Sequence, residues 1–160
     1  MPAIIVLDTG VLSNCVVQFS RQQSAVTHSP SESCRQWLSD CERGGAMLLV
    51  PAIIYYETLR EIERRNATAQ RRRLLEYCFQ PGRFLPLTTA HLESAALLWA
   101  QARNTTGTPT GSSEALDGDT ILCAQVQSLG LAETDYVVAT TNTKHLTQHV
   151  HAELWQNITL

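Results

Sequence analysis

Three short runs of apolar residues rich in Val, Ile and Leu stand out along the chain, at residues 3–7, 46–50 and 136–139. Each run is continuous rather than alternating, and the first two end at Asp8 and Pro51. A continuous run of this length is typical of a strand that is buried on both faces, as in a parallel sheet. The pattern therefore predicts three strands, with the chain turning at Asp8.

Helical patterns separate these runs. The clearest begins at Ser29-Pro30-Ser31-Glu32, which resembles a capping box with proline at the first helical position, and should end at Gly44. Further helices are predicted over residues 53–65, 71–79, 90–103 and 119–129. The Thr-, Gly- and Ser-rich residues 104–114 are expected to form a local loop. Strands that alternate with helices indicate βαβ units, so we predict an α/β fold with a parallel sheet.

Length and composition narrow the class of protein. At 160 residues, with 44% hydrophobic and 17% charged residues, the chain fits one globular domain spanning residues 1–160. No apolar run is long enough to span a membrane and no signal peptide is visible, so we expect a cytoplasmic protein without membrane attachment. The five cysteines lack zinc-site spacing and are expected to be reduced and mostly buried. A net charge of −3 excludes nucleic-acid binding by bulk positive charge.

Acidic side chains stand where functional groups gather in open parallel sheets, beyond the carboxyl ends of the strands. Asp8 ends the first strand, Glu57 lies early in the helix after the second, and Asp117 and Asp119 precede the third. The third strand is followed by Asn142, an amide in place of another acid. Converging carboxylates repel each other unless a cation neutralises them. Oxygen ligands without His or Cys favour Mg²⁺ or Mn²⁺ over zinc.

Each of these acids also has a structural interpretation. Asp117 or Asp119 could cap the helix that they open, and Asp8 could be a turn residue. Glu57 could form a surface pair with Arg60, although the like-charged Glu61 one turn further disfavours two exposed acids at this place.

Four segments together resemble a PIN domain, in the same order and with similar spacing along nearly the whole chain. They are Ile4-Ile5-Val6-Leu7-Asp8-Thr9, Val50-Pro51-Ala52 ahead of Glu57, Leu116-Asp117-Gly118-Asp119-Thr120-Ile121-Leu122-Cys123-Ala124 and Val137-Val138-Ala139-Thr140-Thr141-Asn142. The resemblance implies a three-layer α/β/α fold and a metal-dependent ribonuclease that hydrolyses RNA phosphodiester bonds. Many such domains are the toxins of type II, VapBC-type toxin-antitoxin pairs, so the resemblance also implies a small antitoxin partner and a homodimer.

Carried over by residue, the resemblance makes Asp8, Glu57 and Asp119 the metal ligands, with Asp117 as an alternative or helper. The fourth acidic position of many members falls on Asn142, which lowers the negative charge of the site and weakens any second metal. Gly10 also stands where a polar residue is often found, which leaves Thr9 and Ser13 as the nearby hydroxyls.

Most arginines lie in one region, and Arg60, Arg64 and Arg65 are candidates for RNA contact. Arg60 and Arg64 share one helical face and could follow a phosphate backbone. Alternatively, the arginines of this region pair with nearby glutamates on an ordinary solvated surface. His145 could approach the acids, but the pattern does not favour a catalytic role for it.

Two further functions remain open at this point. A PIN-like domain weakened by Asn142 would bind RNA or a protein partner without cleaving. A response-regulator-like receiver would also place an aspartate at a strand end, but it normally pairs its acids with a lysine after a later strand. Lys144, the only lysine, lies beyond Asn142.

Overall fold

The computed structural model describes residues 2–16, 29–106 and 113–159. Within them, five parallel strands form one sheet in the order β3-β2-β1-β4-β5. The strands are β1 (Ile4–Leu7), β2 (Met47–Pro51), β3 (Phe84–Leu85), β4 (Tyr136–Thr140) and β5 (Ala152–Leu154). The three predicted strands are thus present, and the all-parallel pairing confirms the predicted sheet. The two edge strands, β3 and β5, were not predicted.

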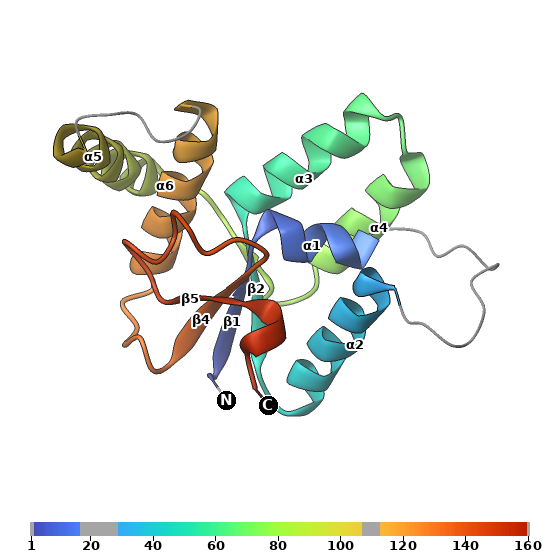
Figure 1. The fold of residues 1–160 in the computed structure, drawn as a ribbon. Helices are drawn as coiled ribbons and strands as arrows, with labels where there is room; N and C mark the ends of the chain where they lie inside the picture. Colours follow the sequence, from blue (N-terminus) through green and yellow to red (C-terminus); the bar gives the residue numbers. More distant parts are fainter. Residues whose placement is uncertain (1, 17–28, 107–112, 160) are drawn as a thin grey trace.

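Helices flank the sheet on both sides, as expected for a three-layer α/β/α arrangement (Figure 1). They are α1 (Thr9–Val16), α2 (Pro30–Arg43), α3 (Ala52–Arg64), α4 (Thr68–Cys78), α5 (Thr89–Thr106) and α6 (Ser113–Gln127), with a short 3-10 helix at Trp155–Asn157. Figure 1 shows α5 and α6 on one side of the strands and α1, α2 and α4 on the other. Helix α3 contacts both α1 and α6, so it brings the two groups of helices together.

The structure corrects the helix boundaries in the second half of the chain. Helix α5 continues to Thr106 and α6 already begins at Ser113, so both ends of the predicted 104–114 loop are helical. Residues 107–112 of that prediction lie outside the described residues. Because α6 begins six residues before Asp119, the interpretation of Asp117 or Asp119 as its N-cap is wrong. Helix α1, which starts directly after Asp8, was not predicted.

The start of α2 follows the sequence signal closely. The Ser29 hydroxyl accepts the backbone N–H of Glu32, and the Glu32 carboxylate accepts the backbone N–H of Ser29. This reciprocal pair confirms the predicted capping box and satisfies two N–H groups that the first turn leaves without a helical partner. The helix ends at Arg43, and Gly45, with a positive φ of 93°, turns the chain toward β2.

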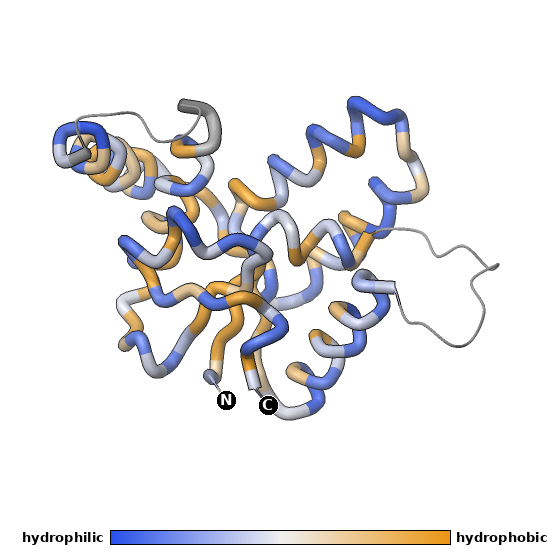
Figure 2. The backbone as a smooth tube through the Cα atoms, viewed as in Figure 1, coloured by the Kyte–Doolittle hydropathy of each residue, from blue (hydrophilic) through white to orange (hydrophobic). Residues whose placement is uncertain are grey.

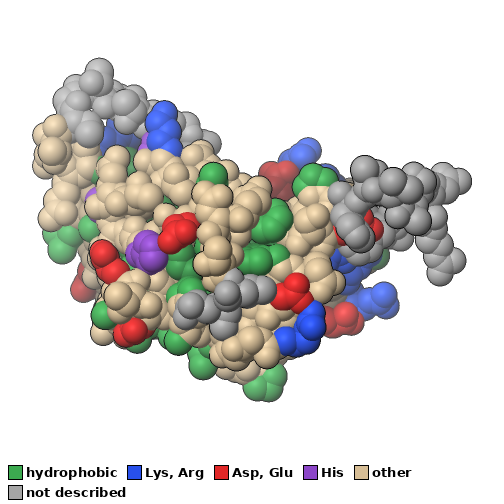
Figure 3. All heavy atoms as spheres, turned by 60° about the horizontal axis from the view of Figure 1, so that its bottom comes forward, with side chains coloured by type: hydrophobic (Ala, Val, Ile, Leu, Met, Phe, Trp, Pro, Cys, Tyr) green, Lys and Arg blue, Asp and Glu red, His purple; other side chains and the backbone are tan. Residues whose placement is uncertain are grey.

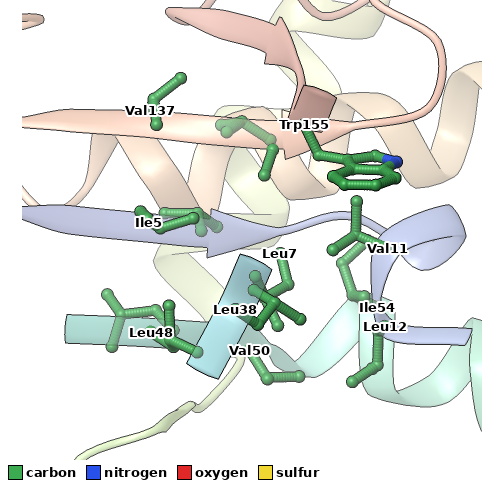
Figure 4. Close-up of a cluster of buried hydrophobic side chains, with 14 of the residues drawn as sticks. Ile5, Leu7, Val11, Leu12, Leu38, Leu48, Val50, Ile54, Val137 and Trp155 are labelled. Carbon is green, nitrogen blue, oxygen red and sulfur yellow. The ribbon is translucent and has the colours of Figure 1, made fainter. Parts of the chain in front are cut away.

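The core lies between the sheet and its helices. Hydrophobic residues concentrate in the central strands and on the inner sides of the helices (Figure 2). Ile5, Val6 and Leu7 of β1 are fully buried, and Figure 4 shows Trp155 beside Val11 of α1. All five cysteines are free and buried, as predicted. No helix among the described residues is long and apolar enough to cross a membrane.

Candidate functional site

Asp8 stands at the carboxyl end of the central strand β1 and begins α1. Its Oδ1 accepts the backbone N–H of Thr9 at 2.7 Å, and its Oδ2 accepts the hydroxyl of Thr140, at the end of the neighbouring β4, at 2.5 Å. Burial raises the pKa of Asp8, and these two hydrogen bonds partly offset that effect. Asp8 therefore joins two strand ends and also caps α1.

Glu57 lies in the second turn of α3, where this helix passes between α1 and α6. Its Oε2 accepts the hydroxyl of Thr9 at 2.5 Å. On the other side, a Cβ placed on Gly118 of α6 would lie 2.2 Å from Glu57 Oε1. A side chain at position 118 would therefore displace the Glu57 carboxylate, and the glycine allows α6 to approach it.

Asp119 follows Gly118 in α6 and is half-buried. Burial, followed by the negative charges of Asp8 and Glu57, raises its pKa to about 6, whereas His145 acts in the opposite direction. The bond from Thr9 to Glu57 and the contact between Glu57 and Gly118 place Asp8, Glu57 and Asp119 in one neighbourhood, although they come from distant parts of the chain.

The remaining predicted site residues are more exposed. Asp117 is exposed, and its backbone carbonyl accepts the hydroxyl of Thr120 within the helix. Asn142 is also exposed, and its side-chain oxygen accepts the backbone N–H of Lys144 at 3.1 Å. The backbone N–H of Asn142 donates to the Thr140 hydroxyl that holds Asp8, so Asn142 is linked to the acids through Thr140.

The three arginines that are candidates for RNA contact differ in their contacts within the protein. Arg64 pairs with Glu61 at 3.1 Å, and Arg65 donates from Nε to the Glu61 carbonyl at 3.1 Å. The Arg60 guanidinium lies 5.7 Å from the ring centre of Tyr56. At the opposite end of the molecule, near the amino ends of the strands, the basic side chains lie beside acidic ones on the right of the view and along its upper edge (Figure 3).

The sequence indicated Thr9 as a nearby hydroxyl, but it did not predict which residues hydrogen-bond to the acids. Thr9 and Thr140 each donate a short hydrogen bond to a carboxylate. A Cβ on Gly10 would lie 2.2 Å from Thr141 Oγ1. The glycine that stands here in place of a polar residue therefore leaves room for the loop after β4. The available signal was the placement of two of these residues, Thr9 and Thr140, directly at strand ends.

The carboxylate oxygens are ligands of the kind that hard divalent cations prefer. As they are placed, however, no three His, Cys, Asp or Glu side chains in the described part of the chain form a group that could hold a metal ion. Asp8 and Glu57 are each turned toward a threonine hydroxyl. The donor chemistry therefore suits Mg²⁺ or Mn²⁺, and each carboxylate that accepts a threonine hydroxyl keeps further lone pairs with which it could contact a cation.

Comparisons with known proteins support the fold. The sequence matches no family model and no curated protein. The structure is similar to a chain in the crystal structure of VapBC2 from Rickettsia felis bound to a DNA fragment from their promoter, with a TM-score of 0.62, 11% identity, and coverage of 94% of this chain and 97% of that one. It is also similar to a chain of VapBC-1 from nontypeable Haemophilus influenzae, with a TM-score of 0.55, 16% identity, and coverage of 96% and 99%. These similarities confirm the predicted PIN-like fold.

Proposed function

We propose that this protein is a Mg²⁺- or Mn²⁺-dependent endoribonuclease that acts as the toxin of a toxin-antitoxin pair. The observation that carries the proposal is that Asp8, Glu57 and Asp119 come together at the carboxyl end of a PIN-like sheet: Thr9, next to Asp8, donates to Glu57, and Glu57 lies against Gly118, next to Asp119. The fold of the VapBC chains supports it further.

Asp8, Glu57 and Asp119 would hold the cation, with Asp117 as an alternative ligand or a helper. The cation, when bound, lowers the pKa of a water and neutralises the charge that develops on the phosphate. The chain itself positions the acids, because Thr140 and Thr9 orient the carboxylates of Asp8 and Glu57. A carboxylate of this set would accept the proton of the attacking water.

Cleavage of single-stranded RNA by the pure protein, with Mg²⁺ or with EDTA, tests the proposal. We expect Mg²⁺-dependent cleavage that Asp8→Asn reduces at least about 100-fold. Asp40→Asn is a matched control, because Asp40 is a carboxylate of α2 that pairs with Arg43 at the surface. Cleavage that persists at full rate in Asp8→Asn would exclude this site.

A PIN-like domain that binds RNA or a protein partner without cleavage is the second candidate. The neutral and exposed Asn142 favours it, because its side-chain oxygen is engaged by the Lys144 backbone. The Asn142→Asp variant separates the two candidates. If the wild-type protein binds RNA but does not cleave it, and Asn142→Asp gains Mg²⁺-dependent cleavage, the weakened domain is the better description.

The partner proposals follow from the same function. We propose a small antitoxin that covers the acids, a homodimer, and RNA contacts by Arg60, Arg64 and Arg65. For a single-stranded RNA, each lost phosphate contact should reduce the slope of log affinity against log salt by about 0.7. An unchanged slope in Arg60→Gln would assign that arginine to the solvated surface.

A further inference from the structure

A cavity of about 160 Å³ opens between α1 and α3, directly beside Glu57. Helix α1 contributes Thr9 and Ser13 to its wall, and α3 contributes Thr58, Glu61 and Ile62. The cavity thus shares Thr9 and Glu57 with the candidate site but extends away from Asp119, which does not line it. If a phosphate of an RNA chain lies at the acids, a neighbouring nucleotide could enter this cavity.

Thr58 is the unusual residue in this wall. Its side chain is buried, with 3% of the residue exposed, yet its Oγ1 has no hydrogen-bond partner. Buried hydroxyls in proteins are normally hydrogen-bonded, and an unmade bond carries a free-energy cost. The Oγ1 atom itself is not exposed to the cavity, so a ligand there would bond to it only after the Thr58 side chain rotates, and that bond would then remove the cost.

The size of the cavity restricts the ligand to a single ring. A volume of about 160 Å³ corresponds to roughly five water molecules at about 30 Å³ each. Cavities for whole small molecules are larger, at about 300–1,000 Å³. One planar ring that belongs to a larger molecule therefore fits better than a complete small-molecule ligand.

The charges of the wall select among such rings. The carboxylate residues Glu57 and Glu61 both line the cavity. Glu57 is the proposed cation ligand, and Glu61 pairs with Arg64 through Oε2, which leaves Glu61 Oε1 as the acceptor for an amino group. Cytosine presents an N4 amino donor at the position where uracil presents a carbonyl acceptor. Arg65 also lines the cavity and can contact the phosphate of the same nucleotide.

We propose that this cavity receives a cytosine base of the RNA next to the phosphate that is cleaved, and that it favours cytosine over uracil there. The position relative to the cleaved phosphate rests on the proposed nuclease function. The base preference itself rests on the cavity wall, so binding can test it without cleavage.

The test measures binding of labelled oligocytidylate and oligouridylate by fluorescence anisotropy, in an Asp119→Asn background that suppresses cleavage. We expect about tenfold tighter binding of oligocytidylate. Glu61→Gln should reduce this preference to about twofold or less, because an amide can also donate to uracil. Glu63→Gln is the matched control, since Glu63 lies on the same helix, pairs with Arg71 and does not line the cavity.

Thr58→Val provides a second variant, because valine keeps the shape and removes only the hydroxyl. It should weaken oligocytidylate binding several-fold while its melting temperature stays at or above that of the parent. Equal affinity for the two oligonucleotides, absence of binding of both, or a preference that neither variant changes would overturn the inference.

The cleavage assay on the wild-type protein keeps this outcome separate from the proposed function. Mg²⁺-dependent cleavage together with equal affinities would refute the cytosine pocket alone. Selective binding of oligocytidylate without cleavage would support the pocket and refute the nuclease.

Discussion

The charge of Asp119 should destabilise the metal-free protein at neutral pH. Its pKa is raised from 3.8 to about 6, first by burial and then by Asp8 and Glu57. An acid whose pKa is higher in the folded state opposes folding at pH values above its unfolded pKa, because ionisation costs more in the folded protein. The full rise in the pKa of Asp119 corresponds to a loss of about 3 kcal/mol in the free energy of unfolding. Solvent screening at a partly exposed side chain reduces this to about 1–2 kcal/mol.

Urea unfolding without divalent cations, at about pH 4 and about pH 7.5, measures this effect. Asp119→Asn should resemble the wild type near pH 4, where the carboxyl group is largely protonated in the folded state. As the pH rises through 4 to 6, the variant should become the more stable protein, by about 1–2 kcal/mol at pH 7.5. Asp40→Asn, which removes a surface partner of Arg43, should show no such gain.

A stability difference between Asp119→Asn and wild type that does not change with pH would refute this reasoning. It would mean that the side chain of Asp119 is solvated in the folded protein and that Asp8 and Glu57 do not influence it. The three acids would then not share one neighbourhood.

Four further outcomes follow from the structure. Saturating Mg²⁺ should raise the melting temperature of the wild type more than that of Asp119→Asn. At a free Mg²⁺ concentration about 100 times the dissociation constant, the free energy of unfolding of the wild type should rise by about 2.7 kcal/mol. Gly118→Ala should lower kcat/KM about tenfold or more by displacing Glu57, and should add little to the loss in a Glu57→Gln background. Gln125→Leu should cost about 2–4 kcal/mol in urea unfolding, because it removes the partner of the buried Ile53 N–H and of the partly buried Leu85 and Pro86 carbonyls. Ser29→Ala should cost about 1 kcal/mol, measured in the same way, by removing the cap of α2.

The sequence predicted those elements whose patterns are long and unambiguous. The three central strands are continuous apolar runs, and α2 carries a complete capping box. The edge strands β3 and β5 have two and three residues, which is too short for any periodicity to emerge. The predicted start of α6, at residue 119, is too late, because Ser113, Gly118 and the acids around it are typical of a loop or a cap. There, packing between α5 and α6 overrides local preference.

The acids of the site were found because each lies near a strand end, and parallel strands bring their carboxyl ends to one edge. The residues that hold these acids could not be found in the same way. The bond from Thr9 to Glu57 spans 48 positions, and the bond from Thr140 to Asp8 spans 132. The need for a glycine at position 118 likewise depends on how closely α6 approaches α3. Such contacts follow from tertiary packing rather than from local pattern.

The position of Glu57 depends on a residue that no charge pattern would single out. Gln125 of α6 is fully buried; its Oε1 accepts the backbone N–H of Ile53, one turn before Glu57, and its Nε2 donates to the Leu85 carbonyl at the end of β3. One amide thus fixes the start of α3 relative to α6 and to the sheet edge. A glutamate here would lose the Nε2 donors and bury a charge. A neutral hydrogen-bonded contact, together with the packing of α3 against α6, therefore helps to hold Glu57 near Asp119 against the repulsion between the two acids.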